Sequence, residues 1–396
     1  MKNIVIRSGS LLMGGIERVL IEFLQNIDLK KYRVFLFIEK DYGKNNVFIS
    51  EVPKDITIFF LKSKELIEKA EYLRSKKKNI FYKILYNSQM HIERRIEIKN
   101  CQKYIESIKD KYGKIDSYID FDCGTNKYIE RLDVEKKIAW LHISYPKLLK
   151  KKYKIIRFGK KLNKYDKVVN ICNEMKEEIE KIYPFLKQKL EVCYNPFNFQ
   201  RIYNLITDCK EVEEKNYLDL LKDEYILAVS RLALEQKDYG TLIKGYKDYI
   251  KNDGKEKLYI IGDGLDKNKI VNLIKKEKLE KDVILLGAMK NPYIWMKHSK
   301  FFVHSSFYEG LPTVIIEAMI CGKIAISSNC PTGPVELLSK DNCGELFNIG
   351  DYKELSQKMK KVSENVKNDN YKKILENRIK EFKIEEILKE FYKIIF

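Results

Sequence analysis

The sequence has little that would anchor it in a membrane or cross-link it. Its longest apolar runs, such as YILAVSRLAL and TVIIEAMI, are far shorter than the roughly 18–20 residues that a membrane-spanning helix needs. The 8 cysteines form no CxxC pair and have no histidine at zinc-binding spacing, so neither a zinc site nor a disulfide framework is predicted. The opening residues MKNIVIRSGS are predicted to be a strand, because Arg7 interrupts an apolar stretch too short for a signal peptide. Free thiols without an export signal predict a cytoplasmic protein.

Acidic residues are in the minority, since 57 Asp and Glu stand against 76 Lys and Arg, for a formal net charge of +19. The excess is concentrated between Lys147 and Lys167, where Asp166 is the only acid. The basic residues inside that segment are Lys150, Lys151, Lys152, Lys154, Arg157, Lys160, Lys161 and Lys164. Because apolar and aromatic residues lie among them, the segment favours an anionic membrane surface as its partner. A solvated face and a nucleic-acid surface are the alternatives.

Apolar runs of strand length alternate with helical periodicity through both halves of the 396 residues. In the first half the expected strands are NIVIRS, YRVFLFIE, ITIFFL, IDSYIDF, KKIAWLH and KVVNICN, and residues 64–111 are helical and highly charged. Residues 200–223 are polar and acidic, which is typical of a connector. The strands EYILAVS, KLYIIGDG, DVILLG, FFVHSS and KIAISSN follow. This alternation predicts two doubly wound α/β domains, residues 1–200 and 201–380, with ligands beyond the carboxyl ends of the strands.

The segment from Phe301 to Gly322 is the most specific one for function. It reads as a strand, a tight loop and a helix, with Pro312 in the first helical turn and Gly322 at the helix end. Backbone N–H groups around Leu311 to Val314 form a natural phosphate site. The candidate residues of this turn are Gly310, Leu311, Pro312 and Thr313. Glu309 precedes the helix and Glu317 lies on it, and a helix that only packs in a core does not need acids so placed. For Glu317 the alternative is a solvated helix residue.

Two cations follow the strand EYILAVS. Arg231 comes directly after it, and Lys237 precedes the next helix, so both are predicted at the carboxyl end of a strand. There they would neutralise a diphosphate, with the arginine offering a two-pronged contact. Gly262 and Gly264 in GDG indicate a close backbone approach, and Met289 follows the strand DVILLG, where a flat base would fit.

The first half offers weaker candidates. Gly14 and Gly15 lie between the first strand and the first helix, where a ligand can approach the backbone. His142 ends the strand KKIAWLH, where a functional role and a structural hydrogen-bonding role are equally expected. Asp120 and Asp122 have the D-x-D spacing of metal-dependent transferases, but we interpret them as solvated acids at a strand end, so no metal site is predicted.

Taken in order, GGIERV, the histidine after a strand, YNPF, SRLALEQK, IIGDG, VILLG, EGLPTVIIEAM and CPTGPVELL resemble family 4 of the retaining glycosyltransferases. The likeness spans residues 1–350 and is strongest in the second half. It implies a GT-B fold, two Rossmann-like domains facing a cleft, with the acceptor bound by the first domain and the donor by the second. It also implies that the final helix, residues 381–396, packs back on the first domain.

The resemblance implies a role for each matching residue. Arg231 and Lys237 would bind the donor diphosphate, Glu309 the donor sugar and Glu317 the ribose hydroxyls. Gly15 would lie near the phosphates, and His142 would touch the sugar. No protein nucleophile, divalent metal or other cofactor is implied, because in such enzymes the leaving diphosphate helps to deprotonate the acceptor hydroxyl.

The CPTGPVELL loop and the basic surface further resemble members that build bacterial surface polysaccharides such as lipopolysaccharide or capsule. The implied donor is a UDP-hexose or UDP-N-acetylhexosamine, and the implied acceptor is a polyprenyl-diphosphate-linked glycan at the inner face of the cytoplasmic membrane. Nucleic acid is not an expected partner. Two alternatives stay open at this point, a UDP-sugar epimerase of the same fold and a non-catalytic protein that binds nucleotide sugars or nucleic acid.

Overall fold

The computed structural model describes residues 1–149, 151–366 and 369–396, which form two compact units. The first unit comprises residues 1–171, 176–197 and 384–396, and the second comprises residues 172–175 and 198–383. The chain thus passes from the first unit to the second after Phe197, three residues before the boundary expected from the sequence. Within the described residues no helix is both long and apolar enough to cross a membrane.

The first unit is built on a parallel sheet of strand order β3-β2-β1-β4-β5-β6-β7. The strands are β1 (Lys2–Ser8), β2 (Tyr32–Lys40), β3 (Thr57–Lys62), β4 (Ser117–Asp120), β5 (Lys136–Leu141), β6 (Lys167–Asn170) and β7 (Leu190–Val192). The helices are α1 (Gly15–Asn26), α2 (Lys64–Ser75), α3 (Ile80–Tyr112), α4 (Tyr145–Leu149), α5 (Lys152–Leu162), α6 (Asn173–Ile182) and α16 (Ile384–Ile395). The central strands are buried because residues such as Ile4, Leu36 and Ile138 are wholly enclosed between helical layers.

The second unit repeats the plan with the order β10-β9-β8-β11-β12-β13, again all parallel. Its strands are β8 (Tyr225–Val229), β9 (Lys257–Ile261), β10 (Val283–Gly287), β11 (Phe302–His304), β12 (Ala325–Ser328) and β13 (Gly344–Phe347). Its helices are α7 (Phe199–Leu205), α8 (Lys210–Glu214), α9 (Tyr239–Lys251), α10 (Lys267–Glu277), α11 (Tyr293–His298), α12 (Thr313–Ile320), α13 (Pro334–Leu338), α14 (Tyr352–Asn365) and α15 (Asp369–Arg378). Two doubly wound parallel sheets are what the sequence predicts, and this prediction is confirmed.

In each sheet the strand order reverses beside the first strand of the unit. The reversal lies between β1 and β4 in the first unit and between β8 and β11 in the second. The connections on either side of a reversal leave toward opposite faces of the sheet, so the carboxyl ends of these strands are open to a ligand. Ligand-binding side chains are therefore expected at the ends of β1, β4, β8 and β11.

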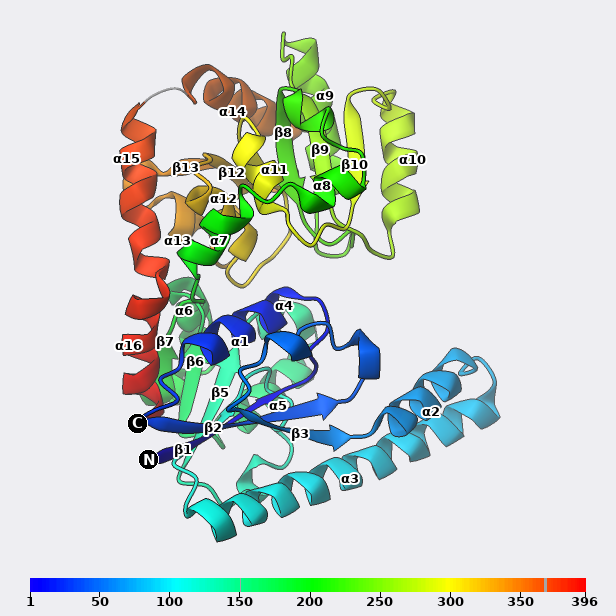
Figure 1. The fold of residues 1–396 in the computed structure, drawn as a ribbon. Coiled ribbons are helices and arrows are strands. Elements are labelled where there is room, and N and C mark those ends of the chain that lie inside the picture. The colour runs from blue at the N-terminus through cyan, green and yellow to red at the C-terminus, as the bar shows by residue number, and fades with distance from the viewer. Residues whose placement is uncertain (150, 367–368) are drawn as a thin grey trace. The chain divides into compact units, whose positions relative to one another are not determined.

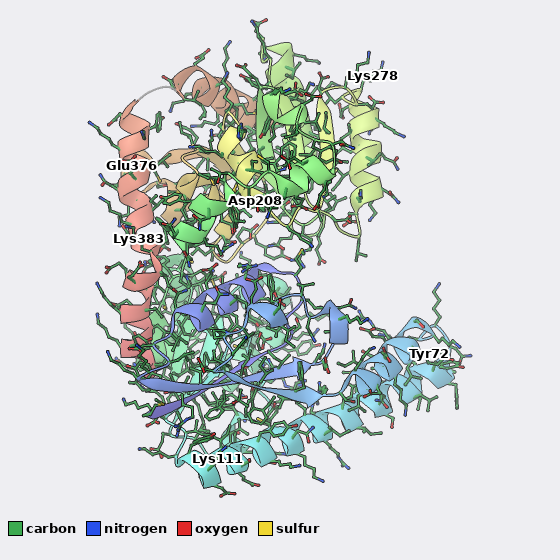
Figure 2. All side chains as sticks on the ribbon, viewed as in Figure 1. Tyr72, Lys111, Asp208, Lys278, Glu376 and Lys383 are labelled. Atoms are coloured by element: carbon green, nitrogen blue, oxygen red, sulfur yellow. The ribbon has the colours of Figure 1, made fainter. Side chains whose placement is uncertain are left out.

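Residues 64–111 are helical, as expected, and form a hairpin. Figure 1 shows α2 and α3 side by side, with their joined end extending away from the strands of the first unit. Figure 2 places Tyr72 near that end and Lys111 at the opposite end of α3. The side chains of Ile80, Phe81 and Ile84 near the joined end are exposed.

Residues 200–223 are not a simple connector between domains. Ile202 on α7 is wholly buried, and Glu211 on α8 accepts backbone hydrogen bonds from Lys290 and Asn291 at 3.1 and 2.9 Å. The Asn291 amide returns bonds to the backbone carbonyls of Leu205 and Asp208. The expectation from polar composition is therefore wrong here, because these polar residues bond to the second unit.

Candidate functional site

The carboxyl ends of β8 and β11 bring together a lysine, a glutamate and a histidine. Lys237 belongs to the loop after β8, and an antiparallel bridge pairs its backbone with Ser306, just beyond β11. Its Nζ lies 2.5 Å from Oε1 of Glu309 and 3.5 Å from Nε2 of His304. The His304 Nε2 lies 3.0 Å from the same carboxylate oxygen. All three residues are buried, at the reversal of the sheet where a ligand is expected.

The protonation states of this cluster follow from its contacts. Burial alone would raise the pKa of the Glu309 carboxyl, but the Lys237 ammonium and the hydrogen bonds from His304 and Lys237 outweigh burial and hold that pKa well below its usual value. Burial, helped by the charge of Lys237, lowers the pKa of His304. The histidine is therefore neutral at neutral pH, and its contact with the carboxylate requires the proton to be on Nε2. The cluster thus holds an ionised Glu309, in contact with the Lys237 side chain, and a neutral histidine.

Hydrogen bonds from other segments hold the loop that carries Glu309 in place. The Glu309 backbone N–H donates to the Pro331 carbonyl at 3.2 Å, and the Thr332 hydroxyl donates to the Glu309 carbonyl. The Gln236 amide lies 3.3 Å from the second carboxylate oxygen, Oε2. Gly333 has a φ of +98°, and a Cβ at this position would lie 2.6 Å from the Gly310 carbonyl oxygen. The segment CPTGPVELL therefore packs against the Glu309 loop and holds it in place. This close packing requires glycine at position 333.

Helix α12 begins directly after this loop. Pro312 is its N-cap and Thr313 its first residue, so the proline lies one position earlier than the sequence predicts. The Ile315 N–H bonds to the Pro312 carbonyl at 3.0 Å, whereas the N–H groups of Thr313 and Val314 precede the helical hydrogen bonds and lie at the positive end of the helix dipole. Gly322, with a φ of +77°, follows the C-cap Cys321, as expected for a glycine that ends a helix. Gly310, Leu311 and Pro312 are buried, and Thr313 is partly exposed.

Arg231 and Glu317 have contrasting surroundings. Arg231 is exposed after β8, and in the described part of the chain its guanidinium has no ion pair. Glu317 on α12 is half-buried and accepts a hydrogen bond from the Tyr293 hydroxyl at 3.4 Å. That hydroxyl also lies 3.3 Å from Nη2 of Arg201, whose guanidinium faces the tyrosine ring. Glu317 is therefore positioned by its neighbours and is not a solvated helix residue.

Gly262 and Gly264 approach the chain's own backbone. A Cβ on Gly262 would collide with the Ser230 carbonyl oxygen, and one on Gly264 would collide with the Leu232 carbonyl oxygen. These glycines therefore let the loop after β9 pack against the loop that carries Arg231. Met289 is buried, and its sulfur lies 3.1 Å from the Lys215 ammonium. Neither observation shows a ligand at these three positions, which stay predictions.

The candidates of the first unit stand at the carboxyl ends of β1 and β5. Gly14 is the N-cap of α1 and Gly15 its first residue. A Cβ on Gly14 would collide with the Glu17 carboxylate, whereas Gly15 has open space around it. The His142 ring packs on Phe121, with ring centroids 4.4 Å apart, and burial lowers its pKa to about 3. Nε2 of His142 has no hydrogen-bond partner among the described residues.

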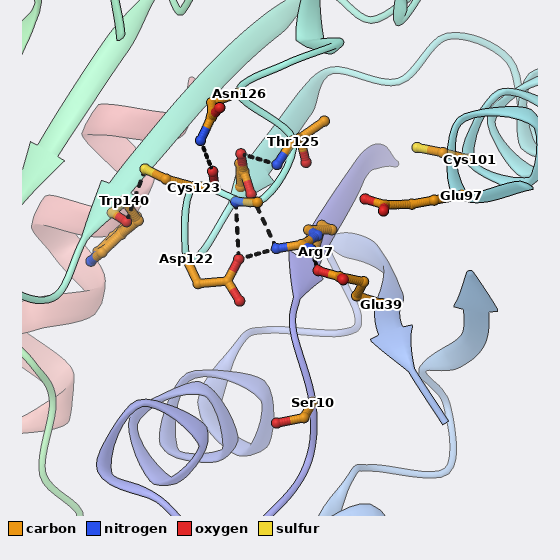
Figure 3. A network of polar contacts seen from close by, with 12 residues as sticks. Arg7, Ser10, Glu39, Glu97, Cys101, Asp122, Cys123, Thr125, Asn126 and Trp140 are labelled. Atoms are coloured by element: carbon orange, nitrogen blue, oxygen red, sulfur yellow. Dashed lines mark hydrogen bonds and ion pairs between the residues drawn. The ribbon is translucent and has the colours of Figure 1, made fainter. Parts of the chain in front are cut away.

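The D-x-D pair has a structural role that the sequence did not reveal. Asp120 is wholly buried, accepts hydrogen bonds from the Thr125 N–H at 2.8 Å and the Tyr165 hydroxyl at 2.5 Å, and lies 3.6 Å from Arg7. The Arg7 guanidinium also pairs with Asp122 and with Glu39, as Figure 3 shows. The interpretation of both acids as solvated is therefore wrong, because Arg7 draws them into a buried ion network.

The described residues assemble no candidate metal site. Over residues 1–149, 151–366 and 369–396, no group of three or more His, Cys, Asp or Glu side chains is arranged to hold a metal ion. The cluster of Lys237, Glu309 and His304 instead combines a cation, a carboxylate and a neutral hydrogen-bonding ring beside the start of a helix. Such a set can bind an anionic phosphate on one side and hydroxyl groups on the other.

Sequence reasoning missed several residues of this site. His304 ends β11 in the same way that His142 follows β5, so the rule applied to one histidine would have found the other. Gln236 directly precedes Lys237, and Thr332 and Tyr293 reach the site from distant segments; none of the three carries a local sequence signal.

Comparison with known proteins identifies the class of the second unit. Residues 210–381 match the family described as "Glycosyl transferases group 1". Over these residues the second unit therefore resembles glycosyltransferase group 1 domains, which confirms at this level the likeness read from the sequence.

Two curated relatives match part of the chain. One is an uncharacterized glycosyltransferase of Methanocaldococcus jannaschii, 36% identical over 232 residues, which are 57% of this chain and 55% of that protein. The other is the N-acetylgalactosamine-N,N'-diacetylbacillosaminyl-diphospho-undecaprenol 4-alpha-N-acetylgalactosaminyltransferase of Campylobacter jejuni, 31% identical over 226 residues, or 55% of this chain and 60% of that protein. The chain spans about half the length of the curated relatives that it matches.

A solved structure extends the likeness of fold over the whole chain. The crystal structure of a point mutant of S. aureus TarM, in complex with Fondaparinux, alpha-GlcNAc-glycerol and UDP, has a TM-score of 0.72, covers 100% of both chains and is 16% identical. At this identity the likeness shows the fold alone. The fold is the two-domain GT-B fold expected from the sequence.

Proposed function

We propose that the protein is a retaining glycosyltransferase of family 4 that transfers a hexose or N-acetylhexosamine from a UDP-sugar to a glycan acceptor on a polyprenyl diphosphate. One observation carries the proposal, namely the buried set of Lys237, Glu309 and His304 at the reversal of the second sheet. It lies inside the matched family domain. The relatives that act in glycan synthesis and the UDP named with TarM support the choice of substrates.

The donor diphosphate would be bound by cations that are placed to receive it. Arg231 is exposed after β8, and Lys237 forms an ion pair with Glu309. The N–H groups at the start of α12 would add to the field at the phosphates. Glu309 would then accept a hydrogen bond from the donor sugar, and Glu317, held by Tyr293, would accept from the ribose hydroxyls.

The chemistry needs stabilisation of the leaving diphosphate more than it needs a nucleophile. As the bond from the sugar to the diphosphate breaks, negative charge grows on the diphosphate, and Arg231, Lys237 and the α12 N-terminus are preorganised to stabilise it. The neutral His304 holds Glu309 in place by its Nε2–H bond. A phosphate oxygen of the leaving group would take the proton of the acceptor hydroxyl, so that no metal is required. Gly14, Gly15 and His142 stay predictions for the first unit.

We propose that the protein works at the cytoplasmic face of the membrane as a peripheral protein. A polyprenyl-linked acceptor resides in the membrane, and the segment from Lys147 to Lys167 offers a high density of exposed cations, although Lys150 lies outside the described residues. Leu148, Tyr153 and Ile156 on this segment are exposed apolar side chains that suit an interfacial position. Each cation near an anionic surface contributes about 1 kcal/mol to binding.

Replacement of Glu309 tests the proposed reaction. Glu309→Gln removes the negative charge but preserves the shape, and it should lower kcat for transfer from the UDP-sugar by about 10²–10³-fold, as loss of one preorganised group at a reacting centre does. Glu235→Gln, an exposed change of the same kind in the nearby loop, serves as the control. NMR of the product should show the anomeric configuration of the donor. Near-normal turnover of Glu309→Gln, or an inverted product, would refute the assignment.

A further inference from the structure

The first unit contains a cavity that has no role in the proposed donor site, and the segment from Lys147 to Lys167 supplies part of its lining. Its volume is about 460 Å³, which lies in the range of small-molecule sites. The lining residues come from α3, from the stretch after β4, and from α4 and α5: they are Arg94, Lys127, Leu149, Tyr153, Lys154, Arg157, Phe158 and Lys161. Five of these eight residues are cations, and none is an acid.

In the part of the chain that the structure describes, no acid forms an ion pair with the cations of this cavity. Among the residues that the structure describes, Arg94, Lys127, Lys154, Arg157 and Lys161 make no ion pair, and Lys161 bonds only to the Asn126 side-chain oxygen at 2.9 Å. The nearest carboxylates already have partners. Glu39 and Glu97 lie 2.8 and 2.9 Å from the Lys62 ammonium, and Glu130 pairs with Lys164.

Repulsion among these cations affects the pKa values of Lys127 and Lys161. Burial, followed by the charges of Arg94 and Arg157, lowers the pKa of Lys127. Burial, followed by Lys127, Arg157 and Arg94, lowers the pKa of Lys161. An anion in the cavity would relieve this repulsion, and two arginines can each contact a phosphate with two parallel N–H bonds.

The cavity also has the position and the lining of a ligand site. Lys127 follows β4, and the start of α5 follows β5, so Lys127 and Lys154 lie toward the carboxyl end of the first sheet. Lys154, Arg157 and Lys161 are spaced i, i+3 and i+7, which places them on one face of α5. Leu149, Tyr153 and Phe158 supply an apolar part of the wall, and the neighbouring Tyr153 and Ile156 are 61% and 50% exposed. A charged interior with an apolar rim suits an amphiphile with a phosphorylated head.

We propose that this cavity binds the phosphate group of a lipid-linked ligand, and specifically the diphosphate of the polyprenyl-linked acceptor. The specific assignment rests on the proposed transferase function, whereas the phosphate site stands on the cavity itself. Arg94 and Arg157 would contact the phosphate oxygens, Lys127 and Lys161 would neutralise the remaining charge, and the hydrocarbon chain would leave past Tyr153. The head group of an anionic phospholipid offers the same chemistry and is the second possible source.

The test compares two double variants with equal loss of charge. Arg94→Ala/Arg157→Ala removes two cations that line the cavity, whereas Arg95→Ala/Lys160→Ala removes two cations on the same helices that do not line it. Wild type and both variants are titrated with farnesyl diphosphate, farnesol and UDP, and with vesicles of phosphatidylglycerol or phosphatidylcholine. Thermal melting confirms that each variant is folded.

The proposal expects at least a tenfold loss of farnesyl diphosphate affinity in the cavity variant, no loss in the control variant, and unchanged binding of UDP. Equal losses in both variants, or farnesol binding as tightly as farnesyl diphosphate, would overturn the phosphate site. A loss of affinity for phosphatidylglycerol vesicles in the cavity variant that exceeds the loss in the control variant, with farnesyl diphosphate binding unchanged, would assign the cavity to membrane phospholipid and overturn the acceptor assignment. If no form binds UDP but farnesyl diphosphate binding depends on Arg94 and Arg157, the transferase function fails while the phosphate site stands.

Discussion

Arg7 and Lys237 are cations beside the reversals of the two sheets, but their surroundings differ. Arg7 at the end of β1 is wholly buried and is bound by Asp122 and Glu39, with Asp120 close by. Its own burial would lower the pKa of its guanidinium, but these three acids raise that pKa further above its usual value, so Arg7 stays charged. Lys237 is also buried, but among the described residues it has a single carboxylate partner, Glu309. The first cation is therefore structural, and the second is the one that we propose to bind the donor diphosphate.

The Arg7 network should be among the costliest single sites to disrupt. Arg7→Met removes the cation and leaves the buried Asp120 without a counter-charge, so the free energy of unfolding should fall by about 3–5 kcal/mol. Urea denaturation followed by the fluorescence of Trp140, which is in the first unit, measures this. The control Arg18→Met breaks the partly exposed pair with Glu51 and should cost less than about 1 kcal/mol. A similar fall in the free energy of unfolding in both variants would mean that burial does not make the Arg7 ion pairs more stabilising than an exposed pair.

At the scale of helices and strands, the sequence predicts the central strands and one edge strand of each sheet, β3 and β10, and misses the strand at the other edge. The strands next to the reversals are near-continuous apolar runs because both of their faces are covered, and this makes them visible in the sequence. The outermost strands at the missed edges, β7 and β13, span only Leu190–Val192 and Gly344–Phe347 and carry no such run. Short edge strands gain their structure from pairing with a neighbour, which no local pattern shows.

The packing of the final helix α16 against the first unit can be measured directly. It belongs to the first unit, where the Phe391 ring lies 4.9 Å from the Phe23 ring and 5.8 Å from the Trp140 ring, between ring centroids. Phe391→Ala should therefore destabilise the first unit by about 3–5 kcal/mol, as buried phenylalanines do.

The two tryptophans report on the two units separately. Trp140 lies in the first unit and Trp295 in the second, so single-tryptophan forms follow each transition in urea. Phe391→Ala should shift the Trp140 transition to lower urea and leave the Trp295 transition in place. Phe185→Ala, at a side chain of the first unit that is 57% exposed, should change stability by no more than about 0.5 kcal/mol. A shift of the Trp295 transition alone would mean that α16 stabilises the second unit instead of the first.

For the molecule as a whole, the part of the site that the sequence predicts is the part that lies on loops after neighbouring strands. Lys237 and Glu309 are 72 positions apart, yet both follow strands that meet at a reversal, so strand order alone brings them together. The bonds to Glu309 from Gln236 and Thr332 depend on packing details that no spacing encodes. The same holds for Arg7, whose pairing with Asp122 joins residues 115 positions apart.

Binding of UDP is the measurement that tests the central claim most directly. Calorimetric titration of UDP into the wild-type protein should show binding that is unchanged by EDTA, because Arg231, Lys237 and the α12 N-terminus would neutralise the diphosphate. Lys237→Ala should weaken this binding by at least about tenfold, or about 1.4 kcal/mol, since it removes a charged contact to phosphate. Lys244→Ala, an exposed change on α9 with the same loss of charge, should bind UDP as wild type does. Binding that EDTA abolishes, or that Lys237→Ala leaves intact, would contradict a metal-independent donor site built on Lys237.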